Sequence, residues 1–199
     1  MPPYNSARRD HLADAAIELL AREGARGLTH RAVDAEAGEP AGTTSRYFRT
    51  RDALMAAVVE RVRDLHLADL ARAPRGPVER SAIGDHLAAM VHNALTANRS
   101  RHMAVSELYL ESTRRPRLHA ALAATRIAQI KLMRDIHLAA GIELSSAQAA
   151  LLVTAITGVV TVALTTPEAI GAHTADDVRD LVRSIVDMVH RSVLVEPAA

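Results

Sequence analysis

Apolar residues recur along this chain every three or four positions, which is the spacing of one face of an α-helix. A first stripe predicts a helix from Ser6 to Arg22, and glycines at positions 24 and 27 mark its end. The apolar residues of this stripe are Leu12, Ala16, Leu19 and Leu20. A later stripe, after Thr50, predicts a longer helix on Leu54, Val58, Val62 and Leu65. Both stripes favour helices with one buried face.

Two short helices are predicted between these stripes. Thr29 is a good N-cap for a helix that reaches Ala37, where Gly38 breaks the pattern. Pro40 suits the first position of a third helix ending near Phe48, because its fixed φ is already helical. A short helix, a tight turn and a second short helix form the pattern of a helix-turn-helix.

Five further helices are predicted beyond a loop at 73–78, which holds Pro74, Gly76 and Pro77. They run over about Arg80–Asn98, Ser100–Thr113, Pro116–Ala140, Ser146–Thr165 and Ala175–Leu194. Pro116 suits a helix start, Gly141 a C-terminal cap, and Ser145 with Gln148 a capping box. We therefore predict an all-α fold: a helix-turn-helix domain at 1–52 and a helical ligand-binding and dimerisation domain at 53–199.

The segment from Leu144 to Pro167 contains no charged residue, so by length it is a candidate for a membrane span. It lacks aromatic anchors and carries a threonine-rich side opposite an apolar one, which a helix buried on both faces explains better. The last helix has its own apolar stripe, from Val178 to Val193. We expect no membrane partner, and we expect these last two helices to seek a second copy of the chain.

Composition narrows the function classes. The 199 residues are 49% hydrophobic and 24% charged with a net charge of +1, which is typical of a chain that buries a core. There are no cysteines, so disulfides and thiolate metal sites are excluded. The histidines show no metal-ligand spacing, so neither a metal nor a cofactor is expected. No secretory signal opens the chain, and a cytoplasmic location is expected.

The third predicted helix carries the candidate chemistry. Between Gly42 and Arg51 the chain has three arginines and no acid. Hydroxyl and aromatic side chains lie among them, so the candidate DNA-contacting set here is Thr43, Thr44, Ser45, Arg46, Tyr47, Arg49 and Arg51. Such groups donate to phosphate oxygens and base edges in the major groove. The alternative is a structural corner with a solvated arginine face.

This stretch resembles the DNA-binding domain of the tetracycline-repressor (TetR) family. The matching parts are Thr29, Ala37–Gly38, Gly42–Thr43, Tyr47–Phe48 and Arg51, with Leu54 after them. The resemblance implies that Thr29, Thr43, Tyr47 and Arg51 occupy positions that touch DNA. It also implies a homodimer through the last two helices, and repression that a small molecule relieves. The segment departs from the family pattern at Asp34, Glu39, Pro40 and Ser45.

The resemblance places an effector cavity among the middle helices. Candidate liners are flexible methionines and isolated polar groups on apolar faces: Met90, Met103, Glu107, Arg126, Met133 and Thr154. The alternative assigns the methionines to the core and the charged residues to salt bridges. The effector itself is not identified by the sequence.

A helical enzyme or ligand carrier without DNA binding is the rival interpretation, and a helical adaptor that binds protein is a further one. No nucleophile with a base and no phosphate-binding glycine loop is present, which argues against an enzyme. A protein interface favours aromatic anchors over arginines and hydroxyls, which argues against an adaptor. We therefore predict a regulator that binds a palindromic double-stranded DNA operator.

Overall fold

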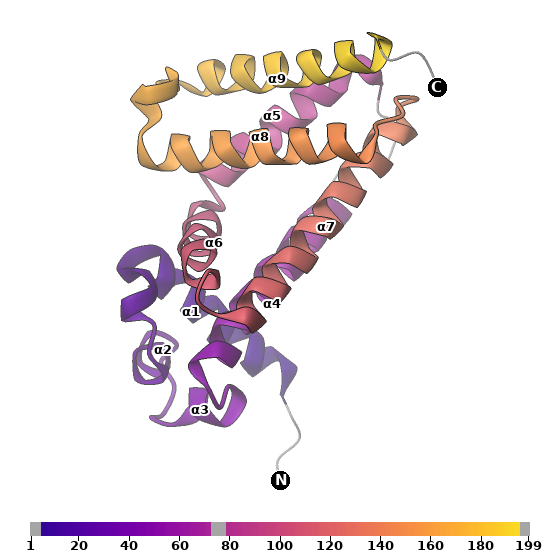
Figure 1. Cartoon of the computed structure of the whole chain (residues 1–199). Helices are drawn as coiled ribbons and strands as arrows, with labels where there is room; N and C mark the ends of the chain where they lie inside the picture. The colour runs from indigo at the N-terminus through magenta and orange to yellow at the C-terminus, as the bar shows by residue number, and fades with distance from the viewer. Residues whose placement is uncertain (1–4, 73–78, 196–199) are drawn as a thin grey trace. The chain divides into compact units, whose positions relative to one another are not determined.

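The computed structural model describes residues 5–72 and 79–195, and every regular element in these ranges is a helix (Figure 1). The elements are α1 (Ser6–Gly27), α2 (His30–Glu36), α3 (Thr43–Tyr47), α4 (Arg51–Arg72), η1 (Arg80–Ala82), α5 (Ile83–Leu95), α6 (Arg99–Ser112), α7 (Pro116–Ala139), α8 (Ser146–Thr165), η2 (Pro167–Ile170) and α9 (Ala175–Val195). The predicted all-α fold is confirmed. The loop predicted at 73–78 lies outside the described residues.

The helices divide into two compact units. The first holds α1 to α4, most of α6 and the first half of α7, up to Thr125. The second holds η1, α5, the rest of α7, α8, η2 and α9. The predicted domain boundary after residue 52 stays a prediction.

The first unit is built around one apolar core. Leu12 and Leu20 of α1 are fully buried, as are Leu54 and Met55 of α4 and Leu108 of α6. Phe48, directly after α3, is 2% exposed and belongs to the same cluster. The stripes read from the sequence are thus the core faces of α1 and α4.

Two helix limits in this unit differ from the prediction. The first helix runs on to Gly27, interrupted at Gly24, whose φ of 68° is in the left-handed region that glycine favours. The third helix starts at Thr43 and not at Pro40, because Gly42 is left-handed with φ 89°. The Pro40 carbonyl instead accepts a hydrogen bond from the backbone N–H of Thr43, at 3.1 Å.

The second unit is held by apolar packing of long helices. Ile83, Leu87 and Val91 follow one face of α5, and Val182 and Val186 belong to the buried face of α9. The capping box is confirmed: Gln148 N–H donates to the Ser145 hydroxyl at 3.2 Å, and the Gln148 side-chain oxygen accepts from the Ser145 N–H at 2.9 Å. The predicted limits of α8 are confirmed.

Helix α8 is, among the described residues, the helix long and apolar enough to cross a membrane by length and composition. Its apolar residues are divided between two faces. Leu152 and Val153 are buried within the unit, whereas Leu151 is 59% exposed. One face of α8 therefore belongs to the core, and another is uncovered in the single chain.

Two histidines are buried in the second unit. His137 of α7 is fully buried and His190 of α9 is 8% exposed, with their ring centres 5.3 Å apart. The Nδ1 of His137 lies 2.8 Å from the Met133 carbonyl oxygen, so this nitrogen carries the proton. The Nε2 atoms of both rings are buried without a hydrogen-bond partner among the described residues. Burial lowers the pKa of each ring.

Candidate nucleic-acid interface

The outward side of α3 carries an arginine and a hydroxyl. Ser45 and Arg46 are exposed, and Arg49 is exposed just beyond the helix. Tyr47 is half-buried, with its ring centre 6.5 Å from that of Phe48. Thr29 is exposed at the start of α2, where its hydroxyl accepts from Ala32 N–H at 3.1 Å as the predicted N-cap. These side chains lie on the surface, as a DNA contact requires.

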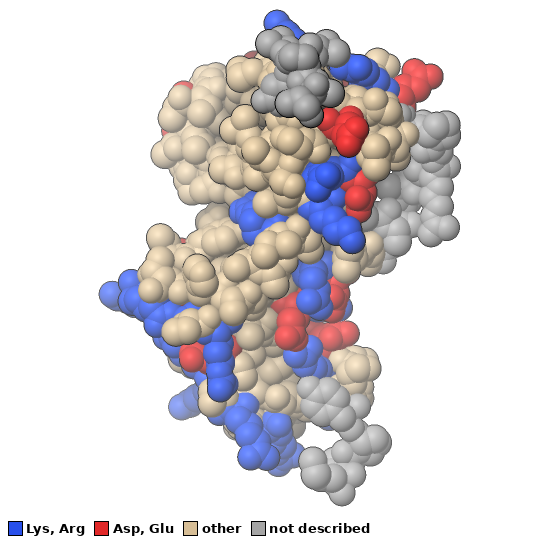
Figure 2. All heavy atoms as spheres, turned by 45° about the vertical axis from the view of Figure 1, so that its right-hand side comes forward, with Lys and Arg blue, Asp and Glu red and all other residues tan. Residues whose placement is uncertain are grey.

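The arginines of the first unit fall into two groups. Arg9 and Arg61 form ion pairs that join α1 and α4, at 2.7 Å to Glu60 and 2.7 Å to Asp14. Within residues 5–50, four exposed arginines instead make no ion pair with any described residue: Arg26, Arg31, Arg46 and Arg49. Figure 2 shows Lys and Arg gathered at the lower end of the face it presents, where α2 and α3 lie in Figure 1. Unpaired guanidinium groups of this kind are available to phosphates.

Two of the predicted DNA-contacting residues, Thr43 and Thr44, point inward. Thr44 is fully buried, and its hydroxyl donates to the Asp34 carboxylate at 2.5 Å. Thr43 is 9% exposed, and its hydroxyl donates to the Pro40 carbonyl at 2.6 Å. In this structure both hydroxyls hold the corner together and do not face solvent. The sequence missed this because the partner of Thr44 is a buried acid on another helix.

That acid, Asp34 of α2, is 3% exposed. One carboxylate oxygen accepts from Gly42 N–H at 2.7 Å, and the other accepts from Thr44 N–H at 2.6 Å. Burial opposes ionisation of this carboxyl, but the hydrogen bonds from Thr44 and Gly42 outweigh burial and lower the pKa of Asp34. Asp34 is therefore an anion at neutral pH. Its charge lies at the start of α3, where the helix dipole favours it.

The other end of α3 is also held from α2. The Nε2 of His30 lies 2.6 Å from the Phe48 carbonyl oxygen. Because a carbonyl only accepts, this ring nitrogen carries the proton. Phe48 itself is fixed by the core and by the Arg9 guanidinium, 5.4 Å above its ring.

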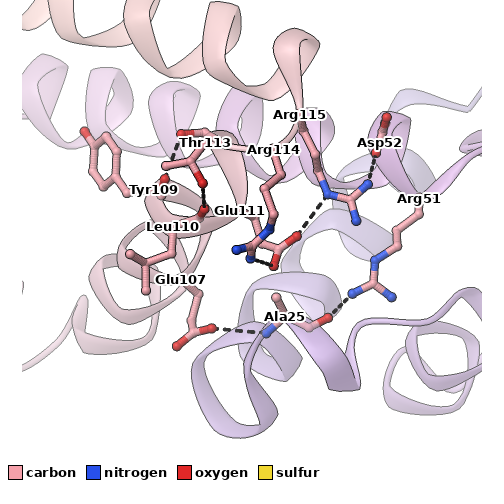
Figure 3. A network of polar contacts seen from close by, with 11 residues as sticks. Ala25, Arg51, Asp52, Glu107, Tyr109, Leu110, Glu111, Thr113, Arg114 and Arg115 are labelled. Carbon is pink, nitrogen blue, oxygen red and sulfur yellow. Dashed lines mark hydrogen bonds and ion pairs between the residues drawn. The ribbon is translucent and has the colours of Figure 1, made fainter.

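Arg51, predicted as a phosphate contact, is turned toward the end of α1 (Figure 3). Its guanidinium donates to the Ala25 carbonyl, and its Nε is buried without a partner among the described residues. The same residue of α1 is held from its other side, since Ala25 N–H donates to the Glu107 carboxylate at 3.2 Å. Arg51 thus braces the interrupted end of α1 in this structure.

Glu107, a candidate effector ligand for which a salt bridge was the alternative, makes its hydrogen bond to the backbone of α1 in this structure. Its carboxylate caps the chain directly after Gly24, and a Cβ on that glycine would stand 3.2 Å from it. One helical turn further along α6, Glu111 accepts from Arg115 at 3.0 Å, and Arg115 also pairs with Asp52 of α4 at 2.5 Å (Figure 3). The Arg115 and Arg114 guanidinium groups lower the pKa of Glu111.

The other candidate effector residues are distributed over both units. Met103 is half-buried in the first unit, and Met133 is half-buried in the second. Met90 is 42% exposed and Thr154 is exposed. Arg126 donates to the Thr157 hydroxyl at 2.7 Å, which joins α7 to α8. A cleft of about 500 Å³ in the second unit, between the start of α5 and the end of α9, includes none of these six residues.

Sequence reasoning did not single out Arg26, Arg31, His30 or Asp34 as functional residues. Asp34 had one signal, because it departs from the pattern of the family that the segment resembles. The partners of Asp34 and His30 lie 8 to 18 residues away, so no local spacing rule identifies them.

Two short helices, with exposed arginines on and just after the second, packed on a helical body define a helix-turn-helix DNA-binding protein. Comparison with sequence profiles of known families supports this class of protein. The profile described as bacterial regulatory proteins of the tetR family matches residues 12–58, and that described as tetracyclin repressor-like, C-terminal domain, matches residues 78–188. The chain belongs to the tetracycline-repressor family. Members of this family are DNA-binding transcriptional regulators that dimerise and bind small molecules.

Solved structures share the fold over 89 to 95% of this chain. A transcriptional regulator from Rhodococcus sp. Rha1 has a TM-score of 0.77 and 21% identity, over 95% of this chain and 99% of that one. A TetR-family member from Streptomyces coelicolor has a TM-score of 0.69 and 28% identity, over 89% and 97%. The multidrug binding protein EbrR, complexed with proflavin, has a TM-score of 0.65 and 27% identity, over 92% and 99%. No curated protein matches the chain.

Proposed function

We propose that this protein is a repressor that binds a palindromic operator and leaves it when a small molecule binds. The observation that carries the proposal is that Arg46, on the outward side of α3, and Arg49, just beyond the helix, are exposed and form no ion pair with a described residue. In this proposal Arg46 and Ser45 face base edges. Thr29, Tyr47, Arg49 and Arg31 face phosphates, and Arg51 acts indirectly by bracing α1.

Binding to an operator is tested by gel shift with the DNA fragment directly upstream of the protein's own coding sequence. We expect a gel shift that requires two half-sites about 34–36 Å apart, or a multiple of that spacing. Selection from random duplexes gives the sequence if that fragment is not bound. If no duplex is bound more tightly than scrambled DNA, the proposal fails.

We propose that the dimer forms through α8 and α9, in agreement with the family's habit of dimerising. The supporting observation is the uncovered side of both helices: Leu151 of α8 is 59% exposed and Met188 of α9 is 68% exposed. Gly158 is also exposed on α8, and without a side chain it permits close approach of a second helix. Val159 and Val189, 8% and 3% exposed, are part of each chain's own core.

We propose small-molecule control because the family binds small molecules, and EbrR is solved with proflavin and with ethidium. By reciprocity, an effector that lowers operator affinity binds the DNA-bound protein more weakly by the same factor. Calorimetric titration of a screened ligand, with and without operator, tests this, and equal affinities contradict it. The regulator acts in the cytoplasm and not as an enzyme in this proposal.

A further inference from the structure

Helix α3 is too short to fix its own direction. It has five residues, and its N-cap, Gly42, supplies no side-chain hydrogen bond. Isolated helices of fewer than about 12 residues are marginal in water even with favourable sequences. The direction in which α3 presents Ser45 and Arg46 therefore depends on contacts from outside the helix.

Those contacts come from two side chains of α2. Asp34 holds the start of α3 through Gly42 and Thr44, and His30 holds its end through the Phe48 carbonyl. A single contact would leave a short helix free to pivot, whereas two contacts at opposite ends define its axis. Residues 30 and 34 are one turn apart and so share a face of α2.

We propose that Asp34 and His30 are positioning residues for DNA recognition: from inside the protein they set how strongly α3 prefers its operator over unrelated DNA. This inference rests on the proposed function, in which α3 reads the operator. Neither residue touches DNA in this scheme. Both act through the helix that they hold.

The chemistry at each end suits the role. The Asp34 carboxylate accepts three hydrogen bonds of 2.5 to 2.7 Å from the backbone of Gly42 and Thr44 and from the Thr44 hydroxyl. These N–H groups belong to the set that a helix start leaves without intrahelical partners. The His30 N–H meets a carbonyl just after the helix. The hydrogen bonds of Asp34 are charge-assisted and have a narrow geometry, so they fix a position as well as adding stability. The His30 hydrogen bond, 2.6 Å long and partly buried, fixes the other end of the helix.

A purely structural role makes a different prediction. If Asp34 and His30 only keep the domain folded, then weakening them lowers binding to operator and to scrambled DNA by the same factor. If they aim α3, operator binding falls while scrambled binding persists. The latter depends on the charges of Arg26, Arg31, Arg46 and Arg49, which these changes leave in place.

The experiment measures affinity for the selected operator duplex and for a scrambled duplex of equal length, by fluorescence anisotropy at several salt concentrations. The full-length variants are Asp34→Asn, Thr44→Val, His30→Ala and His30→Gln. In Asp34→Asn the new NH2 group faces an N–H donor, and Thr44→Val removes one donor at nearly constant shape. Gln places an amide N–H near the position of the His30 Nε2. Asp64→Ala is the control, because Asp64 is exposed and pairs only with its neighbour Arg63 among the described residues.

We expect Asp34→Asn and His30→Ala to lower the ratio of operator affinity to scrambled affinity about tenfold or more, because each removes hydrogen bonds that hold α3. Thr44→Val removes one such hydrogen bond and should lower the ratio less. We expect His30→Gln to restore most of the ratio, and Asp64→Ala to leave it unchanged. Circular dichroism melts monitor folding. If the wild type shows no preferred duplex, the proposed function fails. The positioning role is overturned if the wild type prefers an operator but Asp34→Asn, Thr44→Val and His30→Ala all keep the wild-type ratio of operator to scrambled affinity. The same holds if they weaken binding to both duplexes by the same factor.

Discussion

Helix α3 is held by polar groups, whereas α5 and α9 of the second unit are held by apolar stripes. At α3 a buried carboxylate and an imidazole contact backbone atoms at 2.6 to 2.7 Å, and the carboxylate also accepts from the Thr44 hydroxyl at 2.5 Å. Along α5 the contact face is Ile83, Leu87 and Val91, each at most 2% exposed. Apolar burial supplies most of a domain's stability but is non-directional. Satisfied buried hydrogen bonds supply direction. The contacts of α3, which reads DNA in our proposal, therefore favour a fixed orientation, and the contacts of α5 and α9 favour stability.

Charge placed on the uncovered side of α9 should have the largest effect. In Met188→Arg we expect a folded monomer in sedimentation velocity, because the cation would be desolvated at the proposed contact between two copies. Leu138→Arg, at a similarly exposed position on α7, is the matched control and should remain dimeric. A dimeric Met188→Arg protein would refute the proposed interface. Val189→Arg should instead unfold the chain, since Val189 is 3% exposed.

A cavity in the second unit should destabilise it strongly. Leu152→Ala should lower the free energy of unfolding by about 2–5 kcal/mol, because the fully buried side chain leaves a hole in the core. Leu151→Ala, one position away but 59% exposed, should leave the stability of the isolated fold within about 0.5 kcal/mol. Urea denaturation of both variants in a monomeric background checks the pair. Equal losses would mean that the two faces of α8 are not distinct.

Acid should weaken the second unit through its buried histidines. Burial lowers the pKa of His137 and His190 in the folded state, so the unfolded chain binds more protons once the pH drops below about 6.5. Stability is thus complete above that pH and is lost as the pH falls toward the folded-state values. Arg80 also lowers the pKa of His190, whereas Asp187 opposes this.

The loss should be at most about 1.4 kcal/mol per pH unit for each histidine. Thermal melts from pH 7.5 to 5 measure it, and His190→Gln should flatten the profile. His173→Gln, on an exposed turn, serves as the control. An unchanged profile in His190→Gln would show that this ring does not titrate on unfolding.

The smallest expected effects separate Arg49 from Arg51. Arg49→Ala should reduce the salt dependence of DNA binding by about one counterion per subunit, because its exposed guanidinium faces a phosphate in our proposal. Arg51→Ala should leave that slope closer to wild type and lower the melting temperature, since Arg51 braces the Ala25 carbonyl. If the slope changes in Arg51→Ala and not in Arg49→Ala, the two roles are reversed.

Local signals account for what the sequence predicted well. The limits of α8, the capping box at Ser145 and the start of α7 at Pro116 all depend on residues within a few positions of one another. The family and the all-α fold were also predicted correctly. The contacts that the sequence did not indicate join residues far apart in the chain: Ala25 N–H donates to Glu107, 82 residues away, and the Thr44 hydroxyl donates to the buried Asp34. Helical periodicity says which side of a helix is buried but not which buried polar groups will meet.

The contacts that hold α3 affect how the protein could come to bind a different operator. Asp34 and His30 hold backbone N–H and C=O groups and a single hydroxyl, that of Thr44. The outward residues Ser45 and Arg46 make no hydrogen bond with Asp34 or His30 of α2. If Ser45 and Arg46 read the operator as proposed, substitutions at these two positions can change the operator without changing the contacts of Asp34 and His30. For protein engineering, the outward residues of another recognition helix can be grafted onto α3, provided that the Thr44 hydroxyl, which contacts Asp34, is kept.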